Sequence, residues 1–114
     1  MDKIVVKVMS QEDEDEKFEF VDVDNAGGVV YRYKGIMFTG IIEHYVNDKL
    51  IGEEEFTDGH IGGLQRQYYE NGQLKAEYYQ HFGRMDKYYK KWDESGNLLS
   101  HGIYNDGLLV KMIK

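Results

Sequence analysis

The stretch LQRQYYENGQLKAEYYQ, residues 64–80, predicts a β-hairpin. Tyrosines, which are common in strands, lie on both sides of the pair Asn71-Gly72. A two-residue type I′ turn needs positive φ at both central positions, which glycine adopts freely and asparagine better than most residues. We therefore expect one strand over 64–70, a turn at Asn71-Gly72 and a returning strand over 73–80.

This hairpin is one copy of a repeat with a period of 24 residues. Two columns show the period most clearly: Gly35, Gly59, Gly83 and Gly107, and Leu50, Leu74 and Leu98. A fixed period indicates an architecture in which each unit buries its apolar surface against the next. We therefore expect an all-β fold, with antiparallel hairpins forming a single elongated, twisted and curved sheet.

A two-residue turn also fixes which side chains face each other across each hairpin. The expected pairs are Tyr69 with Leu74, Tyr68 with Lys75, Arg66 with Glu77, Tyr45 with Leu50, His44 with Ile51, Trp92 with Leu99 and Asp93 with Leu98. Aromatic residues then lie on both faces of the sheet, so alternation alone does not show which face is covered.

These motifs resemble the variant MORN repeat, a bacterial repeat found in antitoxin-like and other small repeat proteins. The resemblance covers about residues 31–110 and is carried by the segments Gly35–Gly40, His44-Tyr45, Tyr68–Lys75, Gly83–Asp86, Lys90–Leu98 and Tyr104–Gly107. It implies a row of hairpins in one long sheet and is far less specific for function than for fold. Two departures stand out. Lys87 stands at the position that Gly63, the second glycine of the motif, occupies in the preceding repeat, and the first copy has Asn47-Asp48 in place of Asn-Gly.

The chain is expected to be a single domain, residues 1–114, although residues 1–33 do not follow the period. They predict an N-terminal β cap with strands over 4–9, 18–24 and 29–33, and the acidic run Glu12 to Glu16 as a solvated loop. Residues 34–110 then hold three hairpin repeats and the start of a fourth, and residues 111–114 are the C-terminal end. A last strand near that end carries Lys111 and Lys114, charges that discourage edge-to-edge pairing.

Charge and composition exclude several classes of function. The net charge is -7, with residues 1–58 contributing -9 (six basic against fifteen acidic) and residues 59–114 contributing +2 (eight against six). Such an acidic chain disfavours nucleic-acid binding and favours a partner with a basic surface. There is no cysteine and no apolar run of the roughly 20 residues that would span a bilayer, and the first ten residues are too polar for a signal peptide. We expect a cytoplasmic protein.

No catalytic or cofactor-binding constellation is evident, so neither an enzyme nor a cofactor is expected. The four histidines, His44, His60, His81 and His101, form none of the close pairs that metal sites use. Stacked repeats can bring His81 near His60 or His101, but solvated turn positions explain these residues more simply. Gly62-Gly63 is not followed by the Lys-Ser/Thr of a phosphate-binding loop.

The candidate protein-binding residues are therefore aromatic and acidic. They are Tyr45, Tyr69, Tyr79, Tyr89, Trp92, Glu12, Asp13, Glu14, Asp15, Glu16, Glu53, Glu54 and Glu55. Aromatic side chains are common at binding hot spots, and carboxylates steer a basic partner. The competing interpretation is structural, because in a thin sheet aromatic residues cover one another and acidic runs stay solvated.

The sequence thus predicts a non-enzymatic protein-binding module. With the resemblance, the expectation narrows to a bacterial antitoxin or immunity protein that neutralises a partner toxin, one with a basic surface, by occluding it. The alternative is a structural or scaffold repeat protein that self-assembles, for example as a homodimer through edge strands. Peripheral membrane association is a weaker alternative, because anionic lipid repels carboxylates.

Overall fold

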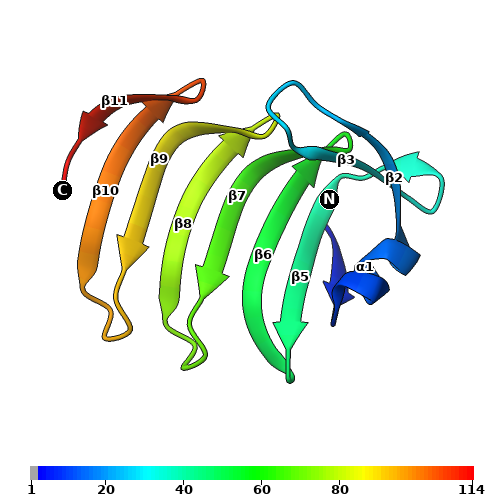
Figure 1. Cartoon of the computed structure of the whole chain (residues 1–114), viewed down its shortest axis with the longest axis horizontal. Coiled ribbons are helices and arrows are strands. Elements are labelled where there is room, and N and C mark those ends of the chain that lie inside the picture. The colour runs from blue at the N-terminus through cyan, green and yellow to red at the C-terminus, as the bar shows by residue number, and fades with distance from the viewer. Residues whose placement is uncertain (1–2) are drawn as a thin grey trace.

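The computed structural model describes residues 3–114, which form one open sheet with a single short helix (Figure 1). Strands make up 65% of the chain and helix 6%, which confirms the all-β prediction. The elements in chain order are β1 (Ile4–Val8), α1 (Gln11–Lys17), β2 (Phe18–Val23), β3 (Val29–Tyr33), β4 (Ile36–Met37), β5 (Gly40–Val46), β6 (Lys49–Thr57), β7 (His60–Tyr68), β8 (Leu74–His81), β9 (Arg84–Trp92), β10 (Leu98–Asn105) and β11 (Leu108–Met112).

The main path of the sheet runs β1-β5-β6-β7-β8-β9-β10-β11. From β5 to β11 each strand pairs antiparallel with the next strand of the chain, as hairpin repeats require. The N-terminal strand β1 departs from this pattern, because it pairs parallel with β5. Strands β2, β3 and β4 pair with one another beside this main path. β3 also pairs with β7 of the main path, at Val30 opposite His60.

The glycine column with the period of 24 residues marks two-residue turns of the type I′ kind. Asp58 and Gly59 have φ of 48° and 88°, and the pairs Lys34-Gly35, Phe82-Gly83 and Asp106-Gly107 have nearly the same values. Three of these four glycines also donate their N–H to the preceding unit: Gly59 to the Phe38 carbonyl at 2.8 Å, Gly83 to Ile61 at 2.8 Å and Gly107 to Met85 at 2.7 Å. The repeated glycine therefore serves both the turn and the contact between neighbouring units.

The turn at Asn71-Gly72 is not the predicted two-residue turn. Tyr69 N–H donates to the Gln73 carbonyl at 2.9 Å, so three residues form the loop, and only Gly72 among them has positive φ. The Asn71 side chain accepts a hydrogen bond from Gln73 N–H at 2.9 Å, which stabilises the longer loop. Asn-Gly suits this turn as well, since a type I turn followed by a left-handed glycine is the next most common hairpin.

The longer loop changes part of the predicted register. Arg66 faces Glu77 as expected, but a bulge places Tyr68 opposite Leu74 rather than Lys75. Trp92 likewise faces Leu98, not Leu99, because the loop of residues 94–96 repeats the same geometry. Three other predicted pairs are also wrong. Tyr69 and Asp93 do not face Leu74 and Leu98, because each closes its loop through a backbone hydrogen bond, to Gln73 and Asn97 respectively. His44 faces Gly52 instead of Ile51.

The two departures from the repeat motif keep the required backbone. Asn47 and Asp48 have φ of 51° and 63°, so this pair forms the two-residue turn that was predicted for Asn71-Gly72, and Tyr45 faces Leu50 as expected. Lys87 adopts φ of 65°, which places it in the left-handed region that Gly63 also occupies.

The core lies at one end of the sheet, where the N-terminal segment folds over β5 and β6. Phe18 of β2 packs against Tyr31 at 5.1 Å and Phe38 at 5.0 Å between ring centroids. Phe56 of β6 packs against Tyr31 and Phe38, each at 5.6 Å. Because β8 to β11 carry no such layer, the apolar core is confined to the cap and the first strands.

The acidic run Glu12 to Glu16 is a helix, α1, and the predicted loop is wrong. Ser10 caps the helix, because its hydroxyl accepts from Asp13 N–H at 3.0 Å. Carboxylates in the first turn are favourable beside the unpaired N–H groups of a helix start. The Ser10 to Asp13 spacing was the sequence signal for this helix, and the charge run obscured it.

Candidate functional site

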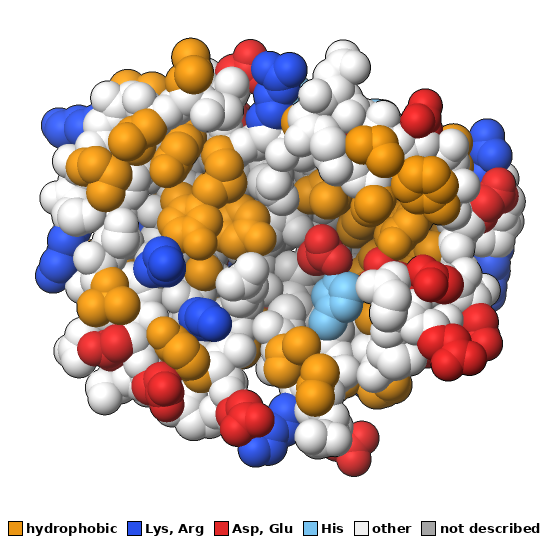
Figure 2. Space-filling model, viewed as in Figure 1, with side chains coloured by type: hydrophobic (Ala, Val, Ile, Leu, Met, Phe, Trp, Pro, Cys, Tyr) orange, Lys and Arg blue, Asp and Glu red, His pale blue; other side chains and the backbone are white. Residues whose placement is uncertain are grey.

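A cavity of about 570 Å³ lies between α1, the loop at Gly27-Gly28 and the strands β5 and β6. Its walls combine carboxylates with apolar side chains such as Val29, Ile51 and Ile61. A second hollow of about 360 Å³ shares His44, Ile51 and Glu54 with it and reaches Tyr78 on β8. Figure 2 shows a histidine and acidic side chains between two groups of hydrophobic side chains on this face.

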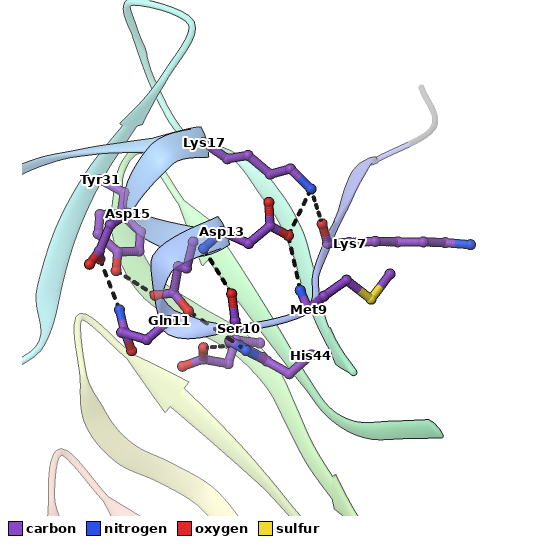
Figure 3. A network of polar contacts seen from close by, with 11 residues as sticks. Lys7, Met9, Ser10, Gln11, Asp13, Asp15, Lys17, Tyr31 and His44 are labelled. Carbon is purple, nitrogen blue, oxygen red and sulfur yellow. Dashed lines mark hydrogen bonds and ion pairs between the residues drawn. The ribbon is translucent and has the colours of Figure 1, made fainter. Parts of the chain in front are cut away.

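The centre of the cavity is a network of four side chains from four elements (Figure 3). His44 Nε2 lies 2.6 Å from a Glu54 carboxylate oxygen, and His44 Nδ1 lies 3.7 Å from Glu14. Tyr31 donates its hydroxyl to the other oxygen of Glu14 at 2.5 Å. Glu14 comes from α1 and Glu54 from β6, so the fold brings the two acidic runs of the sequence together over one imidazole.

The network shifts the titration of its members. The hydrogen bond to Glu54 raises the pKa of His44, burial opposes it, and the charge of Glu14 adds to the rise. Burial and the hydrogen bond to Glu14 raise the pKa of the Tyr31 hydroxyl well above its usual range. Tyr31 is thus a stable donor, and the raised pKa favours the charged form of His44, whose ring lies between the helix and the sheet.

Helix α1 depends on such polar contacts, because none of its residues is buried. Lys17 donates to the Lys7 carbonyl at 2.6 Å and pairs with Asp13 at 3.0 Å. Asp13 also accepts from Met9 N–H at 2.9 Å, which, with Lys17, lowers the pKa of Asp13. The helix is therefore held over the cavity by hydrogen bonds and charge rather than by an apolar face.

The predicted acidic residues are used unequally. Glu55 pairs with Lys3 and accepts from Leu64 N–H, and Glu53 accepts the hydroxyl of Tyr68. Asp15 accepts from the Gln11 amide at 2.9 Å. Glu12 and Glu16 are exposed on α1. Of the eight, Glu14 and Glu54 line the large cavity.

The predicted aromatic residues do not form one surface. Directly paired residues share a face, so Gln65, Tyr78 and Tyr89 lie on the face of the cavity, and the rings of Tyr78 and Tyr89 stack at 5.0 Å. Alternation along the strands places the side chains of Tyr45, Tyr79 and Trp92 on the opposite face, although Tyr45 also borders the cavity. Tyr69 stands past the end of β7, where its hydroxyl donates to the Trp92 carbonyl at 2.8 Å. Their role in binding stays a prediction.

The sequence did not single out His44 or Tyr31 as site residues. The available signal was the repeat column His44, Tyr68, Trp92, in which a histidine replaces an aromatic residue. Tyr31 gave no signal, since its role depends on the fold of the cap over β5.

The stacked repeats bring His60 and His81 to the same aromatic ring. His60 and His81 each pack edge-on against the Phe82 ring, with ring centroids at 4.9 Å and 4.6 Å from it. His60 Nδ1 also lies 3.2 Å from the Asp24 carboxylate and so ties the cap to β7. Within residues 3–114, no group of three or more His, Cys, Asp or Glu side chains is placed to hold a metal ion.

A scan against protein-family models, a search of curated proteins and a search of solved structures each find no match. The resemblance to the variant MORN repeat therefore stays a prediction that depends on the quoted motifs. Across the part of the chain that the structure describes, no helix has the length and apolar character needed to cross a membrane.

The His44 network predicts a pH-dependent contribution to stability. A raised pKa in the folded state means that the contribution is fully present below the unfolded pKa of about 6.5 and is lost as pH rises through the folded pKa. Urea unfolding of the native chain and of His44→Gln should therefore differ more in free energy at pH 6 than at pH 9. His101→Gln, far from the cavity, controls for the loss of a histidine. A difference for His44→Gln that grows with pH would contradict this.

Proposed function

We propose that the chain is a non-enzymatic protein-binding module and that the cavity under α1 receives a basic side chain of the partner. The observation that carries the proposal is the convergence of Glu14 and Glu54 on one cavity of about 570 Å³. These residues come from acidic runs that are 40 positions apart in the sequence. Their meeting concentrates negative charge in a hollow that solvent can reach.

A lysine or arginine side chain fits the composition of this cavity. Its charged head can pair with the carboxylates of Glu14 and Glu54, and its aliphatic stem can contact Val29, Ile51 and Ile61. Two carboxylates against one imidazole leave a net negative site even when His44 is charged. The excess of nine acidic charges over residues 1–58 supports attraction of a basic surface at long range.

A macromolecular partner is favoured over a small ligand by the shape of the site. The cavity continues through His44 and Glu54 into the second hollow, toward Tyr78 and its stacked neighbour Tyr89. An elongated groove of this kind contacts several side chains of a partner at once, with aromatic residues as anchors. The narrower form of the proposal, neutralisation of a basic toxin in the bacterial cytoplasm by occlusion, is supported by the resemblance of the repeats.

The test is a quantitative pull-down with paired charge-neutralising variants. The native chain should recover a stoichiometric protein with a basic surface, and Glu14→Gln with Glu54→Gln should weaken its binding at least tenfold, because two charge contacts are lost. Glu12→Gln with Glu16→Gln is the matched control, since it removes the same charge from the exposed side of α1. If both double variants lose partner binding equally, general charge attraction explains the binding. If both retain it equally, the cavity is excluded as the binding site.

A further inference from the structure

Helix α1 has little stability of its own. It spans seven residues, and none of them is buried. Isolated helices shorter than about 12–15 residues are marginal in water even when they are rich in alanine. Residues 11–17 also carry a net charge of -4, with five acidic side chains against one lysine. The helix must therefore be kept folded over the cavity by its contacts with the rest of the chain.

Both ends of the helix are anchored. Val8 ends β1 on one side and Phe18 directly follows the helix on the other, and both residues are buried. Val8 pairs with His44 of β5, and Phe18 packs against Tyr31 and Phe38. The segment between these anchors cannot swing away as a rigid body. Opening the cavity on this side therefore requires the helix to unwind between Val8 and Phe18.

Only part of the helix reaches across the cavity. Lys17 donates to the Lys7 carbonyl at 2.6 Å and Asp13 accepts from Met9 N–H at 2.9 Å, so these two side chains turn toward the segment that precedes the helix (Figure 3). Glu14 instead accepts the Tyr31 hydroxyl and lies 3.7 Å from His44 Nδ1, and its side chain is only 13% exposed. Glu14 is thus the helix residue that bonds to the far wall of the cavity.

His44 is the one residue lining this cavity that can carry a positive charge, because no lysine or arginine among residues 3–114 lines it. The ionisable groups around the ring come from three elements: Glu14 from α1, Glu54 from β6 at 2.6 Å, and the Tyr31 hydroxyl from β3. β1 contributes the apolar Val8 at the paired position. The contact between the helix and the sheet therefore depends on the charge of a single imidazole.

The cations of the second hollow, which also contains His44, are engaged elsewhere. Arg66 Nε lies 2.9 Å from a Glu77 carboxylate oxygen, and Lys75 Nζ lies 5.4 Å from the centroid of the Tyr69 ring. The remaining ionisable side chains that line the two hollows are Tyr45, Glu53, Tyr68 and Tyr78. None of these four is a cation near neutral pH. His44 is therefore the cation available to Glu14 and Glu54.

The protonation state of the ring decides how many carboxylates it serves. A neutral imidazole has one N–H donor, whereas an imidazolium has two. A neutral ring that donates from Nε2 to Glu54 leaves Nδ1, 3.7 Å from Glu14, with a lone pair and no proton. Only the charged ring attracts both carboxylates. Loss of the proton removes the attraction that holds Glu14 and leaves two carboxylates on one cavity without a cation between them.

We propose that the proton on His44 controls α1 as a lid. With the proton bound, residues 11–17 lie as a helix over the cavity, and without it they unwind and open the cavity to a partner. Closure therefore takes up a proton: it is favoured at low pH and is lost as pH rises through the pKa that His44 has in the closed form. As regulation of the cavity this rests on the proposed function, but the unwinding of α1 does not.

Nuclear magnetic resonance of the protein from about pH 5.5 to about pH 9 tests the lid. The ring signals of His44 give its titration midpoint, and the carbon-α shifts of residues 11–17 give the helical population. We expect the helix signals to titrate with the midpoint of His44 and the unwound fraction to rise roughly three- to tenfold above it, because one charge contact is lost. Helix signals that stay constant while His44 titrates would overturn the proposal.

Two substitutions of histidine separate His44 from other effects of pH. In His44→Gln the helix signals should lose this transition, because glutamine does not titrate. His101→Gln on β10 removes a histidine away from the cavity and should keep the transition. A transition of unchanged size in His44→Gln would overturn the assignment of the switch to His44.

Two substitutions on the helix test the role of Glu14. In Glu14→Gln the titration of His44 should move to lower pH, because a neighbouring negative charge is removed, and the helix signals should no longer follow it. Glu12→Gln removes the same charge from an exposed position of α1 and should leave both titrations coupled. Equal behaviour of the two variants would overturn the role of Glu14.

A small cation tests the opening of the cavity. Nα-acetylargininamide carries one positive side chain and no other charge, and its affinity should rise at least threefold from about pH 5.5 to about pH 9 in the native chain but stay within about twofold in His44→Gln. A pH-independent affinity in the native chain would overturn the coupling of the lid to binding. If the helix titrates with His44 and the probe does not bind, the lid stands and the proposed role of the cavity fails. If the probe binds and the helix does not titrate, the lid fails and that role stands.

Discussion

Replacing Phe56 with alanine is expected to lower the free energy of unfolding by about 3–5 kcal/mol. Phe56 is 1% exposed on β6, so truncation removes a fully buried ring and leaves a cavity. The surrounding rings of Tyr31 and Phe38 each lie 5.6 Å away and belong to the cap and to the segment before β5. The Tyr31 backbone is held in β3, and the Phe38 backbone is held by hydrogen bonds to Tyr31 and Gly59, so the site cannot collapse around the missing ring.

The same substitution should loosen the cap before the rest of the sheet. Phe56 is the contribution of β6 to an aromatic cluster that otherwise comes from residues 18–38. Without it, the pairing of β3 with the main sheet depends on Val30 opposite His60. Hydrogen exchange should therefore quicken in β2 and β3, while β8 and β9 keep their protection relative to global unfolding.

Phe20→Ala provides the matched control for this prediction. Phe20 lies on β2 of the same cap but is 58% exposed, so its removal should cost less than about 1 kcal/mol. Chemical denaturation of both variants, with the native chain as reference, measures the difference. Equal losses at the two positions would contradict the assignment of the core to the inner side of the cap.

The fold of the repeats was predictable because it depends on local chemistry with a fixed period. The glycines of that period occupy positive φ in type I′ turns, and their N–H groups reach the neighbouring unit, for instance Gly83 to Ile61. Loop length at the other end was harder to predict. Asn71-Gly72 and Asn47-Asp48 both favour positive φ, and the side-chain bond of Asn71 to Gln73 N–H decides for the longer loop.

The candidate site was less predictable, because it is assembled by long-range packing. The acidic runs were identified as two separate candidates, and nothing in the sequence showed that Glu14 would meet Glu54. Their convergence on His44 requires β1 to pair parallel with β5, because α1 directly follows β1 in the chain. This parallel pairing belongs to the N-terminal cap, which does not follow the 24-residue period and so could not be predicted from it.

Gly40→Ala is expected to cost about 3 kcal/mol of unfolding free energy, by overpacking. Gly40 is the residue of β5 that faces Ile4 in the parallel pair. A Cβ at this position would clash with the Ile4 carbonyl oxygen and lie 2.9 Å from Cζ of Phe38. Neither neighbour can move freely, since one is backbone in a strand ladder and the other is a ring that is 1% exposed.

Gly62→Ala separates this steric effect from the general effect of adding a methyl group in a strand. A Cβ on Gly62 would meet its nearest atom, Oγ1 of Thr57, at an ordinary distance of 3.5 Å, and the substitution should change stability by less than about 1 kcal/mol. Gly40→Ala should also increase hydrogen exchange in β1 and α1, because displacing β1 removes the strand that carries the helix to His44. If Gly40→Ala keeps normal hydrogen-exchange protection in β1 and full stability, the close approach of Ile4 to Gly40 is not required. The position of α1 over the cavity would then not depend on the parallel pairing of β1 with β5.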